Sequence, residues 1–455
     1  MKDLESIIVD LAYSDWFLRV SERTKHEAKL TILDTLGVCA RGNQTKYIQK
    51  AAAVLAPKSN TEGSALFALG GRRTTASSAA FINASGAATL ELDETLRHGG
   101  GHSAVQVLPA AIAVGERAGS DGKKVLRAFL ASYELGARLG RTLSPFRKIL
   151  HPHGIWAACA SALASSMILD LSKRQAVEAL RISCNLSITT SFNTAFQGAT
   201  IRDFYVGFAS QNGIAASLLA EQGVTGARNA ILEVLHPLIS DSGINGDPQK
   251  FFADFGKVFY IESNQLKVYA ACFSLQAPIE AALKFTKVSD VQNIEKINVY
   301  TTALASRLAR KDPQNALAAK FSIPYAVAST ILAGDSIMES FDDDHVQQRA
   351  VQNLSKKVSV FADDELTKKA PGKWGSRIEV FLKKGSSGSK NIAGVEDTIT
   401  MRSNKSKDKL ETQILKKFRA LVSPIYPKKQ ERDIEEKILN FERIRRVRDL
   451  TDLLL

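Results

Sequence analysis

The stretch WAACASALASSMILDLS, residues 156–172, carries alanine, serine or cysteine at every position but one between residues 157 and 166. Small side chains on all sides of a helix are typical of a helix that is buried on several faces. The same composition occurs in SSAAFINASGAATL (77–90), VLPAAIAVGERAGS (107–120) and FASQNGIAASLLAEQGVTG (208–226). We therefore expect these segments to form the core of a large helical body.

The flanking segments also have helical spacing. HEAKLTILDTLGVCARG (26–42) places its apolar residues on one stripe and ends with glycine, which is a common helix stop. VLRAFLASYELGARLGRTL (125–143) and KRQAVEALRISCNL (173–186) continue the pattern. Up to about residue 260, the chain reads as one helix after another.

The composition changes near residue 265. Alternating or β-branched runs, typical of strands, occur in INVYTTAL (297–304), VSVFADDEL (358–366), SRIEVFLKKG (376–385) and DTITMRS (397–403). Turn-rich stretches such as GSSGSKN (385–391) separate them, and helical spacing returns at KDKLETQILKKFRAL (407–421). We predict a mainly α protein: a helical domain from residues 1–265 and 408–455, with a smaller α+β lid domain, 266–407, inserted between them.

The formal net charge of +13 invites comparison with nucleic-acid-binding proteins. Much of the excess lies in the last third of the chain, where acidic residues are interspersed at helical spacing, as on a solvated helix face. Aromatic interleaving and known nucleic-acid motifs are absent from the sequence. We expect no nucleic-acid partner, and a cationic surface also suits an enzyme that attracts anionic substrates.

The sequence also bears on location. It has no apolar run long enough to cross a bilayer, and its acidic start lacks the features of a leader peptide. The four cysteines are far apart in sequence and lack the paired spacing of a zinc or iron–sulfur site. We predict a cytoplasmic protein with reduced thiols and no membrane partner.

The first group of candidate catalytic residues lies in ELDETLRHGGGHSAVQVLP, residues 91–109. We expect Asp93 and Glu94 to close a helix, a glycine-rich loop to carry His98 and His102, and the next helix to begin near Pro109. Histidines beside carboxylates suit acid–base chemistry, although for His98 alone a solvated loop is the favoured explanation. The HGGG run resembles an esterase oxyanion loop, but the GxSxG motif that such enzymes need is absent.

Two further histidines, His151 and His153, lie in HPHGIWAACASA, where we expect a helix to start. Free N–H groups at a helix N-terminus can bind a carboxylate. A metal site would need a third ligand, and none has recognisable spacing, so we predict no metal. His153 could alternatively belong to a capping loop without chemistry.

Two cationic side chains complete the candidates. Arg202 opens an amphipathic helix in IRDFYVGFASQNG, and a guanidinium can grip a carboxylate with two hydrogen bonds. Lys267 and Tyr269 lie where the chain enters the second domain. Such residues are usually on the surface when taken alone, so only a shared pocket would give them a function.

Eight segments in this order resemble the MmgE/PrpD family, and the resemblance covers nearly the whole chain. They are AKLTILDTLGVCARG, INASGAATLELDE, the His102 loop with VLPAAIAVGE, ASYELGARLG, HPHGIWAACASA, IRDFYVGFASQNGIAASLLAEQGVTG, KVYAACFSLQAPIEAAL and KFSIPYAVASTILAGD. The resemblance implies a helical domain with an α+β lid, an active site between the two, and a homodimer. It also implies a lyase, either a dehydratase or a decarboxylase, for small polycarboxylic acids of the methylcitrate and aconitate type.

By position, the resemblance makes His102, His151, Asp93 and Lys267 the catalytic residues. The predicted substrate-binding residues are Arg202, Gln276, His153 and Tyr269.

This sequence departs from the family pattern at four positions. Arg202 stands where most members have lysine, Gln276 and Ala88 stand where histidines are usual, and Glu94 replaces a second aspartate. Arginine and glutamine cannot transfer protons at ordinary pH, so fewer groups are available for proton transfer.

We therefore expect cofactor-independent chemistry through an enolate-like intermediate, since no dinucleotide fingerprint or other cofactor motif is present. Two alternatives stay open: an epimerase, isomerase or cyclase that uses the same site, and a binding homologue without catalytic activity.

Overall fold

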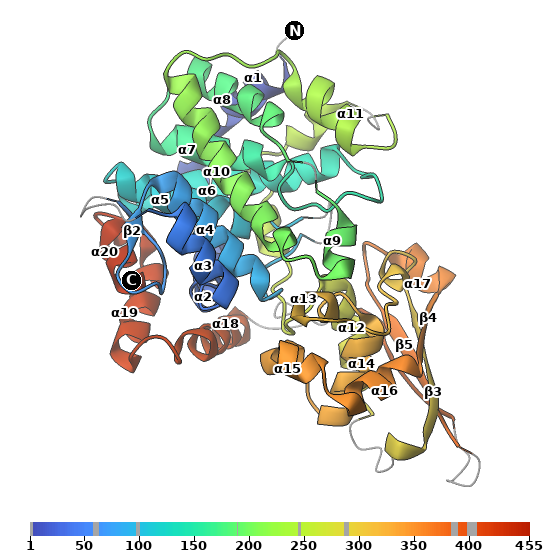
Figure 1. Cartoon of the computed structure of the whole chain (residues 1–455). Coiled ribbons are helices and arrows are strands. Elements are labelled where there is room, and N and C mark those ends of the chain that lie inside the picture. Colours follow the sequence, from blue (N-terminus) through green and yellow to red (C-terminus); the bar gives the residue numbers. More distant parts are fainter. Residues whose placement is uncertain are drawn as a thin grey trace.

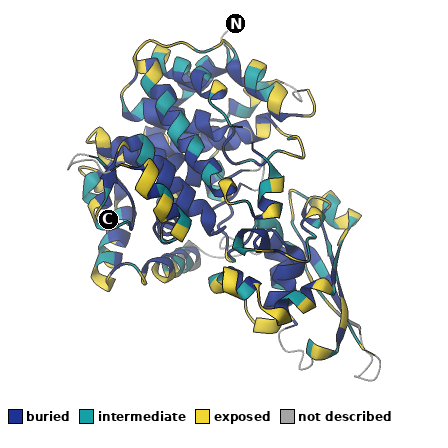
Figure 2. Cartoon of the chain, viewed as in Figure 1, coloured by how far each residue is buried: buried dark blue, intermediate teal, exposed yellow. Residues whose placement is uncertain are grey.

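The centre of the molecule is a group of tightly packed helices that contain many small residues. A computed structural model describes residues 3–57, 63–96, 101–188, 190–243, 247–285, 291–383, 390–397 and 407–455. Its core helices are α4 (Ala76–Thr89), α5 (Ser103–Arg117), α7 (Ala157–Ile168) and α10 (Ile201–Glu221), which pack against one another. α4, α5 and α7 are almost entirely buried (Figure 2), as the small-residue pattern predicts, whereas α10 is buried on one side and partly exposed on the other.

Other helices surround this core (Figure 1). They are α1 (Leu4–Ala12), α2 (Glu22–Gly42), α3 (Lys46–Leu55), α6 (Gly122–Thr142), α8 (Lys173–Asn185), α9 (Phe192–Gln197) and α11 (His236–Ile239). The end of α2 comes very close to α4, because a Cβ atom on Gly42 would lie 1.9 Å from the carbonyl oxygen of Gly86. Only glycine permits that approach.

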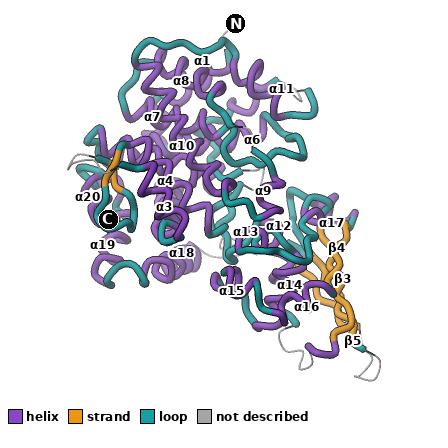
Figure 3. Tube along the Cα trace, in the orientation of Figure 1, coloured by secondary structure: helices purple, strands orange, loops and turns teal. Residues whose placement is uncertain are grey.

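A four-stranded sheet dominates the second region (Figure 3). Its order is β4 (Val358–Ala362), β3 (Ile294–Thr301), β5 (Ser376–Leu382) and β6 (Lys390–Val395). β3 runs parallel to β4, with Ile297 opposite Val358, and antiparallel to β5, with Val299 opposite Ile378. This confirms a mainly α fold with a smaller α+β part.

Helices of the second region pack against this sheet, with α12 against β5 and β6 and α14 against β4. The helices of this region are α12 (Phe273–Leu283), α13 (Ala316–Ala319), α14 (Ile323–Ala333), α15 (Asp343–Val346), α16 (Arg349–Lys356) and α17 (Asp364–Lys369). The strand expected in residues 397–403 lies almost wholly outside the described residues. The fourth strand begins instead at Lys390, within the stretch predicted to be a turn.

The C-terminal helices return to the helical body (Figure 1). α18 (Lys407–Val422) and α19 (Lys428–Leu439) pack against α2, and α20 (Arg448–Thr451) follows. The last residues are tied to an early loop, since the carbonyl oxygen of Leu454 accepts a hydrogen bond from the backbone N–H of Ala68 at 2.7 Å. A short strand pair, β1 (Ser64–Ala65) and β2 (Arg73–Thr74), flanks that loop.

Three predicted helix boundaries near the candidate site are wrong. α4 ends at Thr89, so Asp93 and Glu94 follow the helix and do not close it. α5 begins at Ser103 and contains Pro109 in its interior. α7 begins only at Ala157, which leaves His151 and His153 in the preceding loop.

The four cysteines of the chain are free thiols. Cys39, Cys159 and Cys184 are buried free thiols and Cys272 is partly buried, and the sulfur atoms of Cys159 and Cys184 lie 3.6 Å apart. Within the described ranges, no helix has both the length and the apolar character needed to span a bilayer.

Candidate active site

A short antiparallel bridge joins the segment after α4 to the segment before α12. Thr95 and Gln265 exchange two backbone hydrogen bonds, of 2.9 and 2.8 Å. Asp93 lies two residues before Thr95, and Lys267 lies two residues after Gln265, so the antiparallel pairing brings them together. The bridge therefore joins two candidate residues that are 174 positions apart in sequence.

Lys267 pairs with two carboxylates. Its ammonium nitrogen lies 3.0 Å from Oδ1 of Asp93 and 3.1 Å from Oε2 of Glu91, and all three side chains are buried. Burial alone lowers the pKa of Lys267, but the two carboxylates outweigh it and hold this pKa above its ordinary value. Lys267 is therefore a permanently charged group within the protein interior.

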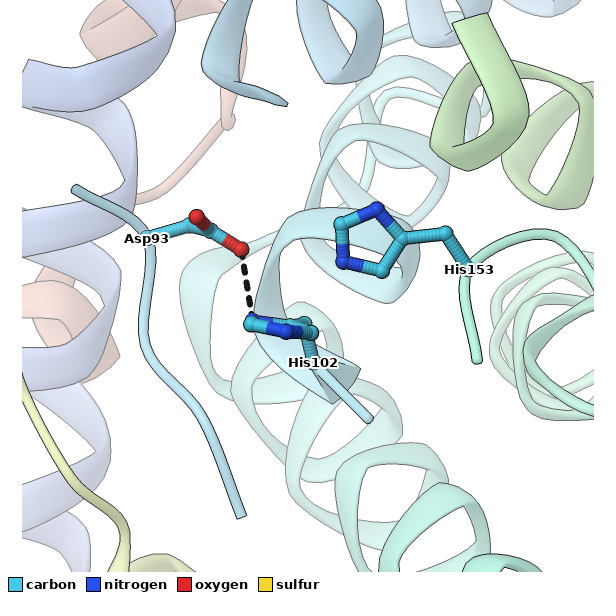
Figure 4. Close-up of side chains that lie close together, drawn as sticks. All are labelled: Asp93, His102 and His153. Carbon is cyan, nitrogen blue, oxygen red and sulfur yellow. Dashed lines mark ion pairs between the residues drawn. The ribbon is translucent and has the colours of Figure 1, made fainter. Parts of the chain in front are cut away.

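His102 contacts the second carboxylate oxygen of Asp93, the one that does not contact Lys267 (Figure 4). Its Nδ1 atom lies 2.7 Å from Oδ2 of Asp93 and 2.6 Å from the carbonyl oxygen of Glu94. Both partners are acceptors, so Nδ1 carries a proton and Nε2 is the nitrogen that can gain or lose one. Burial raises the pKa of Asp93, but Lys267 and His102 overcome this and hold it well below its usual range.

His153 lies between two other histidines. Its ring centroid is 4.4 Å from that of His102 and 4.5 Å from that of His151. The backbone N–H of His153 donates to Nδ1 of His151 at 3.2 Å. The His153 side chain is fully buried, yet neither of its ring nitrogens has a hydrogen-bond partner in the part of the chain that the structure describes. An imidazole of this kind is available to a ligand.

Arg202, the second residue of α10, contacts several groups. Its Nη2 atom forms an ion pair with Glu91, and its Nη1 atom donates to the carbonyl oxygen of Ala88 at 3.1 Å and to Oδ1 of Asp203 at 3.2 Å. Its Nε atom lies 3.5 Å from Nε2 of His151. The guanidinium is thus bonded to protein groups on every side.

His102 differs from the other two histidines of this site in charge environment and in access. Burial, reinforced by the charge of Arg202, lowers the pKa of both His151 and His153 well below the ordinary value, so both rings are neutral. The His102 side chain is 11% exposed, compared with 1% for Asp93 and 0% for Lys267. His102 therefore combines partial access with a paired carboxylate.

Asp93, His102 and His153 also form a possible metal site, since one ligand atom from each lies within 4.8 Å of the others. Lys267 and His102 already occupy the two oxygen atoms of Asp93, so a metal ion would have to replace one of these contacts. The sequence-based expectation of a site without metal stays a prediction.

Comparisons with known proteins identify the family of this chain. A family model described as the MmgE/PrpD N-terminal domain matches residues 3–236, and one described as the MmgE/PrpD C-terminal domain matches residues 269–443. The chain belongs to the MmgE/PrpD family.

Relatives of this MmgE/PrpD chain include a cis-aconitate decarboxylase from Aspergillus terreus (strain NIH 2624 / FGSC A1156), which is 23% identical over 83% of this chain and 80% of its own length. A cis-aconitate decarboxylase from Mus musculus is 25% identical over 73% of this chain and 70% of its own length. A 2-methylcitrate dehydratase from Escherichia coli (strain K12) is 23% identical over 54% of this chain and 52% of its own length.

Six of the eight predicted site residues meet in this MmgE/PrpD chain: Asp93, His102, His151, His153, Arg202 and Lys267. We call these six residues, together with Glu91, the histidine–ion cluster. Ion pairs, ring contacts and one hydrogen bond link these seven residues in a continuous series, in the order Glu91, Lys267, Asp93, His102, His153, His151 and Arg202.

The other two predicted residues have partners outside the histidine–ion cluster. The side-chain amide of Gln276 bonds to the backbone of Val268, Tyr269 and Ala271, at 3.0–3.3 Å. The hydroxyl of Tyr269 donates to Glu280 on α12. This geometry favours a positioning role for Gln276, and substrate binding by either residue stays a prediction. His98 lies outside the described residues.

Sequence reasoning missed Glu91 and Lys320. Lys320 is buried, and its ammonium donates to the carbonyl oxygen of Thr89 at 2.6 Å. The available signal for Glu91 was its place in the acidic run ELDE. It stands two residues before Asp93, the spacing that puts two side chains on the same side of an extended chain. Lys320 opens the KFSIPYAV segment, where only the family resemblance singled out the residues.

Proposed function

We propose that this chain is a cofactor-independent lyase, either a dehydratase or a decarboxylase, for a small polycarboxylic acid of the methylcitrate or aconitate type. The observation that carries the proposal is the His102–Asp93 pair, which lies inside a buried network with Lys267. The names of the relatives, cis-aconitate decarboxylase and 2-methylcitrate dehydratase, support the reaction class and the kind of acid.

In the proposed mechanism, Nε2 of His102 transfers the proton. The Nδ1–H of the same ring donates to the carbonyl oxygen of Glu94 at 2.6 Å, and Oδ2 of Asp93 lies 2.7 Å from Nδ1 as its ion-pair partner; together these two acceptors fix the tautomer and the orientation of the imidazole. When a bond α to a carboxylate is broken, negative charge of enolate type develops on the substrate. Fixed cations in a buried site stabilise such charge more strongly than water does, and Lys267 is the cation attached to the same aspartate.

His151 has a narrower role in this mechanism. Because its ring is buried beside Arg202 and neutral, it does not supply an imidazolium proton. We assign it to substrate orientation, together with His153.

A second candidate function is epimerisation, isomerisation or cyclisation on the same site. The specific observation is that Gln276, at a position where many family members have histidine, is fully bonded to the backbone and cannot transfer a proton. The imidazole of His102 beside Asp93 suits removal and return of one α-proton as well as it suits elimination.

The domain division also stays a proposal. We propose that residues 1–265 and 408–455 form one helical domain, and that residues 266–407 form a lid. The packing of α18 and α19 against α2 supports this division. We also propose that the protein is a homodimer, which light scattering of the purified protein tests directly. We propose no nucleic-acid or membrane partner.

The test of function is NMR of the purified protein with 2-methylcitrate, cis-aconitate and iminodisuccinate in deuterated water. We expect turnover of at least one acid, and a loss of about 100-fold or more in His102→Ala. His236→Ala, which changes a partly buried histidine on α11, is the control and should keep the parent rate.

The outcomes separate the candidates. Loss of water or carbon dioxide identifies the lyase, whereas deuterium incorporation or stereochemical scrambling without such loss identifies the second candidate. Binding of the acids without any reaction would favour a non-catalytic homologue. An unchanged rate in His102→Ala would remove His102 from the mechanism.

A further inference from the structure

Lys417, on the C-terminal helix α18, forms hydrogen bonds to both of the segments that carry the Asp93–Lys267 pair. Its ammonium nitrogen donates to the carbonyl oxygen of Leu92 at 2.7 Å and to that of Lys267 at 3.2 Å. Leu92 directly precedes Asp93 in the chain. A single ammonium therefore binds the backbone of one proposed catalytic residue and the backbone next to the other.

An ion pair ties the same ammonium to the helical body. Oδ1 of Asp34, on α2, lies 2.8 Å from Nζ of Lys417. The side chain of Lys417 is 8% exposed and that of Asp34 is 0% exposed. Charges attract each other more strongly in such a buried place than at an exposed surface. Lys417 thus joins two active-site segments to α2, against which α18 packs (Figure 1).

The backbone pairing between the two segments is short. Thr95 and Gln265 form an isolated bridge, two residues away from Asp93 and Lys267. In a longer antiparallel ladder, further hydrogen bonds would fix how far apart the two chains lie. Here the carbonyls bound by Lys417 lie on the other side of the Asp93–Lys267 pair along both segments. The pair is therefore attached at both ends, by the bridge and by the ammonium.

The proposed mechanism depends on the distances that this arrangement holds. Oδ1 of Asp93 lies 3.0 Å from Nζ of Lys267, and Oδ2 lies 2.7 Å from Nδ1 of His102. Both contacts are of hydrogen-bond length, so a shift of either segment by about 1 Å would break one of them. A misplacement of about 1 Å can lower the rate of a reaction about 100-fold.

We propose that Lys417 is a positioning residue for catalysis, which fixes Asp93 and Lys267 relative to each other through the backbone of their two segments. This inference rests on the proposed function, because it takes Asp93 and Lys267 as catalytic groups. Lys417 acts through other residues and is not itself catalytic. It also gives the C-terminal part of the chain, which returns to the helical body as α18, a role in the active site.

Lys417→Met keeps an unbranched side chain and removes the ammonium. We expect kcat to fall at least about tenfold with whichever of 2-methylcitrate, cis-aconitate and iminodisuccinate the parent turns over. KM should stay within about twofold of the parent, because the pair acts on charge and protons in the transition state. Steady-state kinetics measure both quantities. A folded Lys417→Met protein with the kcat of the parent would overturn the proposal.

The matched control is Lys29→Met. Lys29 also joins α2 to the C-terminal part of the chain, since its Nζ atom lies 3.0 Å from Oε2 of Glu442, and its side chain is 11% exposed. Thermal unfolding should show lower stability in both methionine variants. In Lys29→Met, however, kcat should stay within about twofold of the parent. Equal losses of kcat in the two variants would overturn the proposal, because the effect would then follow general stability.

NMR of protein labelled with ¹⁵N-histidine gives a readout that does not need turnover. The Nδ1–H of His102 donates to the carbonyl oxygen of Glu94 and lies beside Asp93, and its signal is identified by its absence in His102→Ala. We expect this signal to shift or broaden in Lys417→Met and to keep its position in Lys29→Met. An unchanged signal in Lys417→Met would overturn the proposal. If the parent turns over none of the three acids, the proposed function fails, and this signal still decides whether Lys417 positions Asp93.

A second substitution covers the case in which Lys417→Met does not fold. Lys417→Gln is also uncharged but keeps a shorter side chain with an amide donor, and kcat should fall in the same direction. The kcat of the parent in a folded Lys417→Gln protein would overturn the proposal. Failure of both variants to fold would also overturn it, because Lys417 would then be required for the fold and not for positioning alone.

Discussion

The ring of His153 lies 4.4 Å from the ring of His102, centroid to centroid, and the two planes cross at 83°. Both nitrogens of the His153 ring are buried without a hydrogen-bond partner among the described residues. An unsatisfied buried polar group costs about 1–3 kcal/mol, and a bound substrate can offset that cost. His153 is therefore placed to contact a ligand beside the proton-transferring imidazole.

His153→Phe replaces the imidazole with an apolar ring and removes the unsatisfied nitrogens. We expect the temperature of unfolding to stay equal or to rise, while kcat/KM falls about tenfold or more. Thermal unfolding and kinetics of the same preparation measure both quantities. A structural imidazole would give the opposite result, with lower stability and retained activity.

His151→Phe is the comparison for that substitution. His151 accepts a hydrogen bond from the His153 backbone and lies beside Arg202, so its loss should reduce stability as well as activity. If His151→Phe were as stable as the parent, the interpretation that His151 is partnered and His153 is not would be wrong.

Asp93→Asn keeps the shape of the side chain and removes its charge. His102 then loses the carboxylate that lies 2.7 Å from its Nδ1 atom. We expect kcat to fall about 100-fold or more, because the imidazole loses the carboxylate that orients it. Kinetics between pH 5 and 9 are the measurement.

Glu134→Gln is the control for Asp93→Asn. Glu134 is a buried carboxyl group on α6 that contacts Arg138, away from the histidine–ion cluster, and burial raises its pKa to about 8. Its substitution should leave kcat within about twofold of the parent in the protein that remains folded. Equal losses in both variants would mean that Asp93 acts through general stability and not through His102.

The helical body could be predicted from composition because small side chains on every face leave a helix few stable environments other than a packed interior. Gly42 shows the reason in detail, since its α-carbon lies against the backbone of Gly86. The strands β3, β4 and β5 were predictable because each alternates or is β-branched. These signals are local, so the sequence carries them directly.

The helix boundaries beside the site were predicted wrongly because their signals are weak. No side-chain cap precedes α7, whose N-cap residue is Trp156, and the sequence therefore placed the helix too early. At α4 the C-cap is Leu90, without glycine or proline to mark the stop. The acidic residues beyond it were consequently taken as part of the helix.

The pairing of Lys267 with Glu91 could not be predicted from local patterns. The two residues are 176 positions apart and meet only because Thr95 pairs with Gln265. The family resemblance supplied Asp93 and Lys267 as site residues, but it did not supply their partner Glu91. Sequence reasoning therefore made Arg202 a substrate-binding residue and Lys267 a catalytic one without foreseeing that both pair with protein carboxylates.

Arg202→Lys tests how much of the arginine's role is structural. The guanidinium reaches Ala88, Glu91, Asp203 and His151 together, and a lysine ammonium cannot reproduce this planar set of donors. We expect the free energy of unfolding to fall by about 1–3 kcal/mol. We also expect KM to rise more than kcat falls, because Arg202 orients substrate-binding groups and transfers no proton.

Chemical denaturation and steady-state kinetics of Arg202→Lys are the measurements. Lys320→Arg provides a comparison. Lys320 also interacts electrostatically with Asp203, and this substitution keeps the positive charge while it changes the geometry. A large fall in kcat at constant KM in Arg202→Lys would contradict a role in binding and positioning.

Glu94→Gln should change how stability depends on pH. Burial raises the pKa of Glu94 from an ordinary value of 4.5 to about 8, so between these values the folded protein binds a proton that the unfolded chain has lost. The free energy of unfolding contributed by this group therefore falls as pH rises through this range and is constant above it. Glutamine cannot titrate, so the stability of the variant relative to the parent should increase from pH 5 to pH 8 by about 1 kcal/mol or more. Urea unfolding curves at intervals of one pH unit measure this difference, and parallel pH profiles for the two proteins would show that Glu94 does not keep its proton in the folded state.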